Sequence, residues 1–240
     1  MFDRRGPTFI ELAQQALSST TKGYDLLAPK FEYTPFRTPD ELLIPLAEAV
    51  GGPIDRALDL CCGTGAAMRA LRPICRKTIA GIDLSQGMLD EAERLLKADD
   101  ASQSDSEVRL IQGDVLEMDF DEEFDVLTTC GAFGHILHHQ QDQFAERVHR
   151  ALVPGGRFLF VTGPMPPVAS RAWWFSRTFN GIMHVRNALI KPPFIMFYLT
   201  FTLERAREVL ERQGFQLEVR TPYEDTPYPA ARLVIATKEL

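Results

Sequence analysis

A strand, a glycine turn and a helix follow one another between residues 56 and 71, and this segment limits the possible folds more than any other. Residues 57–62 form a short, mainly apolar run, as expected for a parallel strand covered on both faces. Gly63 and Gly65 flank Thr64 and can adopt positive φ values. The first turn of the following helix leaves N–H groups without partners, which suits an anionic ligand group. The segment therefore predicts a ligand loop in an α/β protein.

The residues around this loop help to distinguish a dinucleotide from a ligand that carries an ammonium group. A dinucleotide-binding loop carries a third glycine, and this chain has Met68 at that position, which disfavours an NAD(P)-binding oxidoreductase without removing it as an alternative. Asp59 lies four residues before Gly63. A carboxylate there would repel a pyrophosphate but would attract a ligand that carries an ammonium group.

Acidic residues fall at the ends of three successive predicted strands. Asp59 is in the first strand, Asp83 ends the strand 78–83, and Asp114 ends the strand 108–114. In an open α/β sheet, ligands bind outside the carboxyl ends of the strands, and the spacing of Asp83 from the glycine loop is that of a carboxylate on ribose hydroxyls. A single acid of this kind is more often a cap or turn residue, but three in step predict one shared site.

The remaining pattern alternates strands and helices, which predicts a doubly wound, mostly parallel sheet. Strands are expected at 124–130, 157–162, 215–220 and 232–237, the last two as an antiparallel pair, and helices at 8–19, 39–50, 86–97, 140–152 and 202–214. Ser85 is expected to cap the helix at 86–97, and Thr38 the helix at 39–50 with Pro39 in its first turn.

Two motifs resemble those of one enzyme family. Asp59-x-x-x-Gly63-x-Gly65 resembles the first motif of the class I S-adenosylmethionine (SAM) methyltransferases, and Leu152-x-Pro-Gly-Gly-x-Phe resembles a later turn of the small-molecule enzymes of types 11 and 25. The resemblance covers about residues 55–163. It implies a Rossmann-like, seven-stranded, mostly parallel sheet with a C-terminal antiparallel hairpin, SAM as cofactor and S-adenosylhomocysteine as product.

The resemblance also assigns cofactor contacts. Asp59 and the loop from Gly63 to Gly65 would meet the amino acid end of SAM, Asp83 the ribose, and Asp114 with Val115 the adenine. Further cofactor contacts are expected from Tyr24, Cys61, Cys62, Thr64, Leu84, Met88 and Cys130. A SAM-fold binding or regulatory protein without turnover is the alternative that these residues leave open.

The expected layout is one domain with an added cap and insertion. Residues 1–50 form an N-terminal helical cap, 55–163 the SAM-binding core, 164–201 an insertion, and 202–240 a C-terminal helix and hairpin. The insertion is too long for a plain connection, and it is basic, without an acid and rich in aromatic residues. We expect it to cover an apolar, aromatic or lipid-like acceptor through Trp173, Trp174, Phe179, Arg186 and Phe197. Covering a sheet face or a dimer contact is an equal alternative, and contact with membrane lipid is a third.

His135 follows the fourth predicted strand and is the candidate general base, because a histidine titrates near neutral pH. A contact to cofactor or substrate without proton transfer is the alternative for His135, and Tyr24 and Tyr33 are further candidates. The spacing of His135, His138 and His139 could suggest a metal site, but no cysteine is near them in the sequence, so no metal site is predicted.

The composition narrows the class of protein further. A net charge of −7 and the absence of Asn/Asp-Pro-Pro-Tyr/Phe after the fourth strand argue against a nucleic-acid substrate. Four cysteines without Cys-x-x-Cys spacing, and no run of signal-peptide or membrane-spanning length, predict a reduced, cytoplasmic protein. The acceptor, the atom that is methylated and the oligomeric state stay open.

Overall fold

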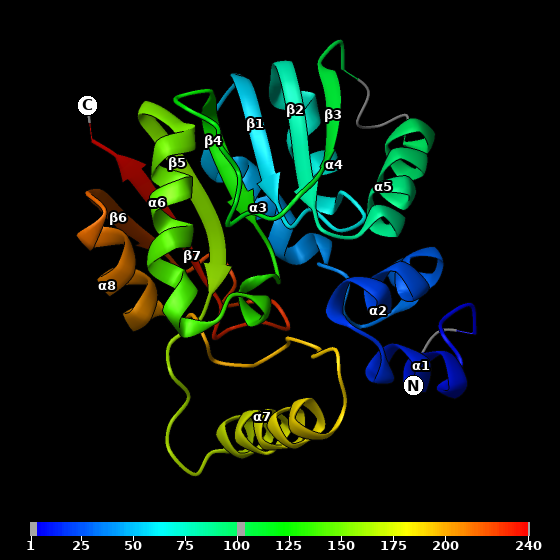
Figure 1. Cartoon of the computed structure of the whole chain (residues 1–240). Helices are drawn as coiled ribbons and strands as arrows, with labels where there is room; N and C mark the ends of the chain where they lie inside the picture. The colour runs from blue at the N-terminus through cyan, green and yellow to red at the C-terminus, as the bar shows by residue number, and fades with distance from the viewer. Residues whose placement is uncertain (1–3, 100–103, 240) are drawn as a thin grey trace.

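The computed structural model describes residues 4–99 and 104–239. Within these residues, a seven-stranded sheet of order β3-β2-β1-β4-β5-β7-β6 forms the centre (Figure 1). β1 to β5 run parallel, and β7 is antiparallel to both β5 and β6, which confirms the predicted fold class. The strands are β1 (Ile54–Leu60), β2 (Cys75–Asp83), β3 (Glu107–Gln112), β4 (Phe124–Thr129), β5 (Leu152–Thr162), β6 (Phe215–Arg220) and β7 (Arg232–Lys238).

Helices cover both faces of the sheet and enclose two apolar cores. One core joins α3 (Asp40–Val50), α4 (Ala66–Leu71) and α5 (Gln86–Ala98) to the sheet. The other joins α6 (Gln141–Ala151) and α8 (Leu203–Arg212) to the opposite face. Leu58 and Leu60 in β1 are fully buried because the central strand lies between these two layers.

The cap contains more helix than the sequence indicated. α1 (Phe9–Leu17) and α2 (Thr20–Leu27) precede the 3₁₀-helix η1 (Ala28–Tyr33), and neither α2 nor η1 was among the predicted helices. α2 begins after Ser19, whose side chain accepts a hydrogen bond from the Lys22 N–H. α3 starts one residue later than predicted, because Pro39 and not Thr38 is its N-cap.

Several further boundaries differ from the sequence prediction, since β2 begins at Cys75 and not at residue 78, and β5 begins at Leu152 and not at residue 157. β1 ends at Leu60 because Cys61 takes a φ of 53° and turns the chain into the glycine loop. The insertion holds the 19-residue helix α7 (Arg171–Leu189), capped by the Ser170 side chain. The 3₁₀-helices η2 (Arg72–Ile74), η4 (Phe133–His135) and η5 (His138–Gln140) complete the connections. None of the helices in the described ranges has the length and apolar character that a bilayer crossing requires.

Gly81 in β2 offers a test of the packing between the sheet and α4. A Cβ at Gly81 would lie 2.5 Å from Met68 Sδ and 2.8 Å from Cys62 Sγ. We expect Gly81→Ala to lower the free energy of unfolding by about 1–3 kcal/mol, as overpacked cores do. Urea unfolding measures this. Gly181→Ala in α7 is the control, since a Cβ there meets no atom within 4 Å and alanine favours the helix. Equal destabilisation of the two variants would contradict the packing described here.

Candidate active site

A cavity of about 560 Å³ lies at the carboxyl ends of the central strands, within the size range of small-molecule sites. Its walls come from the cap, the glycine loop, the loops after β2, β3 and β4, and the segment 196–202. Most of the cofactor residues predicted from the sequence line it: Tyr24, Cys61, Cys62, Gly63, Thr64, Asp83, Leu84, Met88, Asp114, Val115 and Cys130. The structure therefore gathers these residues around one space.

Asp59 and Gly65 lie behind the glycine loop and do not line the cavity. Asp59 is 2% exposed, and the nearby Met68 backbone acts to lower the pKa of its carboxyl group. Burial, together with the charge of Asp83, raises the pKa of Asp59 well above its usual range. Gly65 takes a φ of 75° as the N-cap of α4. Asp59 thus lies in the buried part of β1, and Gly65 lies at the junction of the loop with α4.

Asp83 ends β2 at the cavity wall and is fixed by the backbone on both sides. Its Oδ2 accepts the Gly63 N–H at 2.9 Å, and its Oδ1 accepts the Ser85 N–H at 2.9 Å. Burial raises the pKa of Asp83, and these hydrogen bonds oppose the shift. Each carboxylate oxygen keeps a further acceptor site for a ligand hydroxyl.

Asp114 follows β3 beside this carboxylate. Its Oδ1 accepts the Leu116 N–H at 2.9 Å, and the Gly113 N–H donates to the backbone oxygen of Asp83 at 3.0 Å. Because β2 and β3 are neighbouring parallel strands, their ends deliver the two acids to the same edge of the sheet.

These residues fit SAM. Gly63 and Gly131 line the cavity with positive φ, and a Cβ at either position would meet no atom within 4 Å, so the space beside both is open. Carboxylates that line a partly enclosed cavity suit a ligand with hydroxyl donors and a cationic sulfonium. Among the residues that the structure describes, no group of three or more His, Cys, Asp or Glu side chains is arranged to hold a metal ion.

His135 and Tyr24 form a hydrogen-bonded pair in the cavity wall. The Tyr24 hydroxyl lies 3.0 Å from Nε2 of His135, and Nδ1 of His135 contacts the Ile195 carbonyl. A carbonyl can only accept, so Nδ1 carries the hydrogen and Nε2 accepts from the tyrosine. Burial lowers the pKa of His135 and raises that of Tyr24, so both groups are neutral near pH 7.

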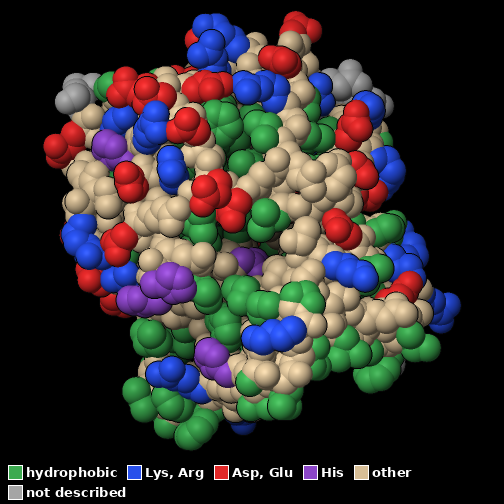
Figure 2. Space-filling model, in the orientation of Figure 1, with side chains coloured by type: hydrophobic (Ala, Val, Ile, Leu, Met, Phe, Trp, Pro, Cys, Tyr) green, Lys and Arg blue, Asp and Glu red, His purple; other side chains and the backbone are tan. Residues whose placement is uncertain are grey.

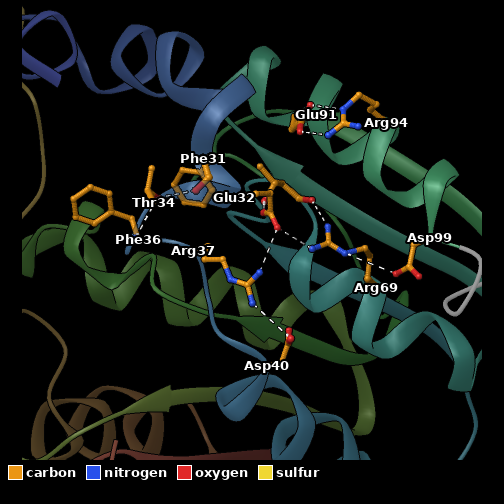
Figure 3. A network of polar contacts seen from close by, with 11 residues as sticks. Phe31, Glu32, Thr34, Phe36, Arg37, Asp40, Arg69, Glu91, Arg94 and Asp99 are labelled. Carbon is orange, nitrogen blue, oxygen red and sulfur yellow. Dashed lines mark hydrogen bonds and ion pairs between the residues drawn. The ribbon is translucent and has the colours of Figure 1, made fainter. Parts of the chain in front are cut away.

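The cap is bonded to the glycine loop and to α4 through a network that sequence reasoning missed, and Figure 3 shows its part around Glu32, Arg37 and Arg69. Glu32 accepts a hydrogen bond of 2.6 Å from the Thr64 hydroxyl and contacts the guanidinium groups of Arg69 at 3.4 Å and Arg37 at 3.9 Å. Asp25 of α2 accepts hydrogen bonds from the Ser85 hydroxyl and the Gly87 N–H. Neither acid stands in a recognisable motif, so only the fold reveals these contacts.

The insertion divides into an inner segment and an outer helix. Residues 196–202 line the cavity, including Phe197, whose N–H donates to the Gly134 carbonyl at 2.9 Å. The other residues expected in the lid lie on α7, outside this segment, and do not line the cavity: Trp173, Trp174, Phe179 and Arg186. The Arg186 guanidinium instead donates to the backbone oxygens of Ala16 and Ser18.

Several cavity residues were absent from the predicted site. The aromatic ones are Phe31, Phe36, Phe133, Tyr198 and Phe201. The density of aromatic residues in the cap and the insertion was a signal for an apolar wall. It did not distinguish the side chains that face the cavity from those that face away.

Comparison with known proteins agrees with this geometry. Residues 57–156 match the model of a methyltransferase domain. The chain is 29% identical over 171 residues to the demethylmenaquinone methyltransferase of Lactobacillus johnsonii, covering 68% of each chain. It is 30% identical over 157 residues to that of Bacillus licheniformis, covering 63% of this chain and 62% of the relative.

Solved structures share the fold. The N-methyltransferase NodS from Bradyrhizobium japonicum superposes with a TM-score of 0.57 at 16% identity, covering 82% of this chain and 93% of that one. The match to a methyltransferase domain and the curated relatives confirm the predicted enzyme class and methyl donor, in preference to a nicotinamide-dependent oxidoreductase. The chain is thus similar to SAM-dependent methyltransferases of small molecules, and it is a SAM-dependent methyltransferase with SAM as the methyl donor.

Proposed function

We propose that this enzyme methylates an apolar, ring-containing acceptor of the quinone type, in a reduced form that bears a hydroxyl group. The hydrogen-bonded pair of Tyr24 and His135, in the wall of the cavity that Asp83 and Asp114 also line, carries the proposal. The relatives named as demethylmenaquinone methyltransferases support a quinone as the acceptor.

The cavity wall supports a neutral, apolar acceptor. Six aromatic side chains besides Tyr24 line it: Phe31, Phe36, Phe133, Phe197, Tyr198 and Phe201. Phe133 stacks on Phe201 with ring centroids 4.4 Å apart, which makes a rigid apolar surface. No lysine or arginine among the described residues lines the cavity, so an acceptor with a phosphate or carboxylate group would find no cationic partner.

Tyr24 and His135 act on the acceptor's proton. The acceptor hydroxyl gives its proton to the Tyr24 oxygen as the tyrosine passes its own proton to Nε2 of His135. The Ile195 carbonyl, which already accepts from Nδ1, stabilises the imidazolium that forms. SAM supplies an electrophilic methyl group on its sulfonium. Loss of the proton raises the electron density on the acceptor oxygen and on adjacent ring carbons, so the same pair serves methylation at either atom.

We expect His135→Ala and Tyr24→Phe each to lower kcat by roughly 10²- to 10⁴-fold, the usual range for loss of proton transfer. Affinity for S-adenosylhomocysteine should change little, as calorimetry would show. Tyr33→Phe is the matched control, because Tyr33 is also in the cap but does not line the cavity. An unaltered rate in both site variants would remove the pair from the chemistry.

The pH dependence follows from the direction of the His135 shift. Burial lowers the pKa of His135 from its ordinary value of 6.5, so the imidazole stays neutral and able to accept a proton below pH 6.5. Activity falls only as the pH drops through that lowered pKa. We therefore expect the acidic limb of kcat/KM against pH to lie below 6.5. A limb at or above 6.5 would mean that another group limits the rate.

Asp83→Ala should weaken binding of SAM or S-adenosylhomocysteine by about 1.5–3 kcal/mol, the scale of hydrogen bonds to a charged group. Isothermal calorimetry measures the loss. Asp55→Ala is the control, since Asp55 is an exposed acid at the other end of the sheet that pairs with Lys77. Unchanged affinity in Asp83→Ala would refute a ribose contact at this residue.

The acceptor class is tested by product formation. With a reduced quinone that has no long side chain, we expect S-adenosylhomocysteine and the methylated quinol to appear together, as mass spectrometry would show. A phosphorylated amine of similar size serves as the comparison acceptor. Preference for that amine would overturn the quinone proposal. Binding of S-adenosylhomocysteine without turnover on any acceptor of the panel would favour a binding or regulatory protein.

A further inference from the structure

Helix α7 is built with its polar side inward. The Asn180 amide donates to the Tyr198 carbonyl at 2.9 Å and accepts the Tyr198 N–H at 2.8 Å. Asn187 makes the same pair of bonds to the backbone of Phe194, at 3.0 and 2.9 Å. These two asparagines therefore bond the backbone of residues 194–198, the segment that leads into the cavity wall.

The outward side of α7 carries many large apolar side chains, unlike that of an ordinary surface helix. Five large side chains that recur at helical spacing are largely exposed: Trp174 at 58%, Phe175 at 62%, Ile182 at 61%, Val185 at 60% and Leu189 at 79%. A contiguous apolar surface of this kind marks a site of interaction.

Helix α1 extends this surface. The Arg186 guanidinium donates to Ala16 O at 2.9 Å and to Ser18 O at 2.6 Å, so the end of α1 is bonded to α7. α1 has no buried residue, and Phe9, Ile10 and Leu17 are 85%, 69% and 59% exposed. Hydrophobic side chains gather along the lower edge of the molecule in Figure 2, over α7 and toward α1. We call this combined face of α1 and α7 the apolar face.

The charge around the apolar face identifies its partner. Residues 164–201 contain Arg171, Arg177, Arg186 and Lys191 and no acid, in a chain of net charge −7. Arg171, Arg177 and Lys191 are exposed. On α1 the acid Glu11 is already paired with Lys30 at 2.7 Å. Exposed tryptophan, aliphatic side chains and a cationic border are the features of a helix that lies in the interface of an anionic membrane.

A second copy of this chain fits the apolar face less well. A two-fold contact over α7 would bring the cationic border of one copy against that of the other. An anionic bilayer surface accepts both the apolar side chains and the positive charges, and it requires no matching partner shape.

We propose that the apolar face of α1 and α7 docks the enzyme onto an anionic membrane surface. α7 lies flat on the bilayer and does not cross it. Because Asn180 holds Tyr198, a cavity-lining residue, docking brings the cavity wall close to the lipid. Transfer of a lipid-like acceptor from the bilayer into the cavity rests on the proposed function, whereas docking itself does not.

Vesicle co-sedimentation of the full chain tests this inference. We expect at least tenfold tighter binding to vesicles of phosphatidylglycerol and phosphatidylcholine than to phosphatidylcholine alone. Trp174→Glu combined with Val185→Glu should weaken binding to the anionic vesicles at least tenfold. Ile44→Glu is the matched control, because Ile44 is a 56% exposed apolar residue on α3 and should leave binding intact.

The readouts separate docking from catalysis and folding. The double variant should keep wild-type affinity for S-adenosylhomocysteine and wild-type turnover of a water-soluble acceptor, so a folded active site with lost vesicle binding supports the inference. Absence of vesicle binding by the wild-type chain, or equal binding by the double variant, would overturn it. So would a dimer of the wild-type chain in size-exclusion chromatography that the double variant converts to monomer, because a second copy would then cover the apolar face.

Discussion

The hydrogen bonds between the Asp83 carboxylate and the backbone on either side of it are the interaction on which the site depends. Oδ2 holds the Gly63 N–H of the loop after β1, and Oδ1 holds the Ser85 N–H at the start of α5. One partly buried carboxylate thereby fixes the ends of β1 and β2 relative to each other. Asp83 also lines the cavity, so the side chain that orders the loop is accessible to a ligand there.

The cap is hydrogen-bonded to the loops at the carboxyl ends of the strands. Glu32 is bonded to Thr64 in the glycine loop, Asp25 to Ser85, and Tyr24 to His135. Each bond joins the cap, through a residue between 24 and 32, to a different part of the core, so the cap forms one wall of the cavity. A neutral histidine beside a neutral tyrosine follows from that enclosure, because burial disfavours the charged form of both.

The insertion contains a segment that lines the cavity and a helix, α7, that faces the solvent. Its inner segment, residues 196–202, supplies aromatic side chains to the cavity, and α7 outside it leaves its apolar residues uncovered. The asparagines on the inward side of α7 bond the main chain of residues 194–198. The backbone of residues 194–198 thus lies between the aromatic cavity and the exposed helix α7, and hydrogen bonds from the two asparagines connect it to α7.

Local patterns in the sequence determined the sheet, the glycine loop and the two acids that line the cavity, because strand periodicity, turn residues and strand ends are encoded by near neighbours. His135 was placed near the site for the same reason. Only the tertiary structure decided that Asp59 lies behind the loop, that Tyr24 is the partner of a histidine far along the chain, and that Trp174 faces outward. These outcomes depend on contacts between distant segments and on the rotation of a helix about its axis, and aromatic density alone indicates neither.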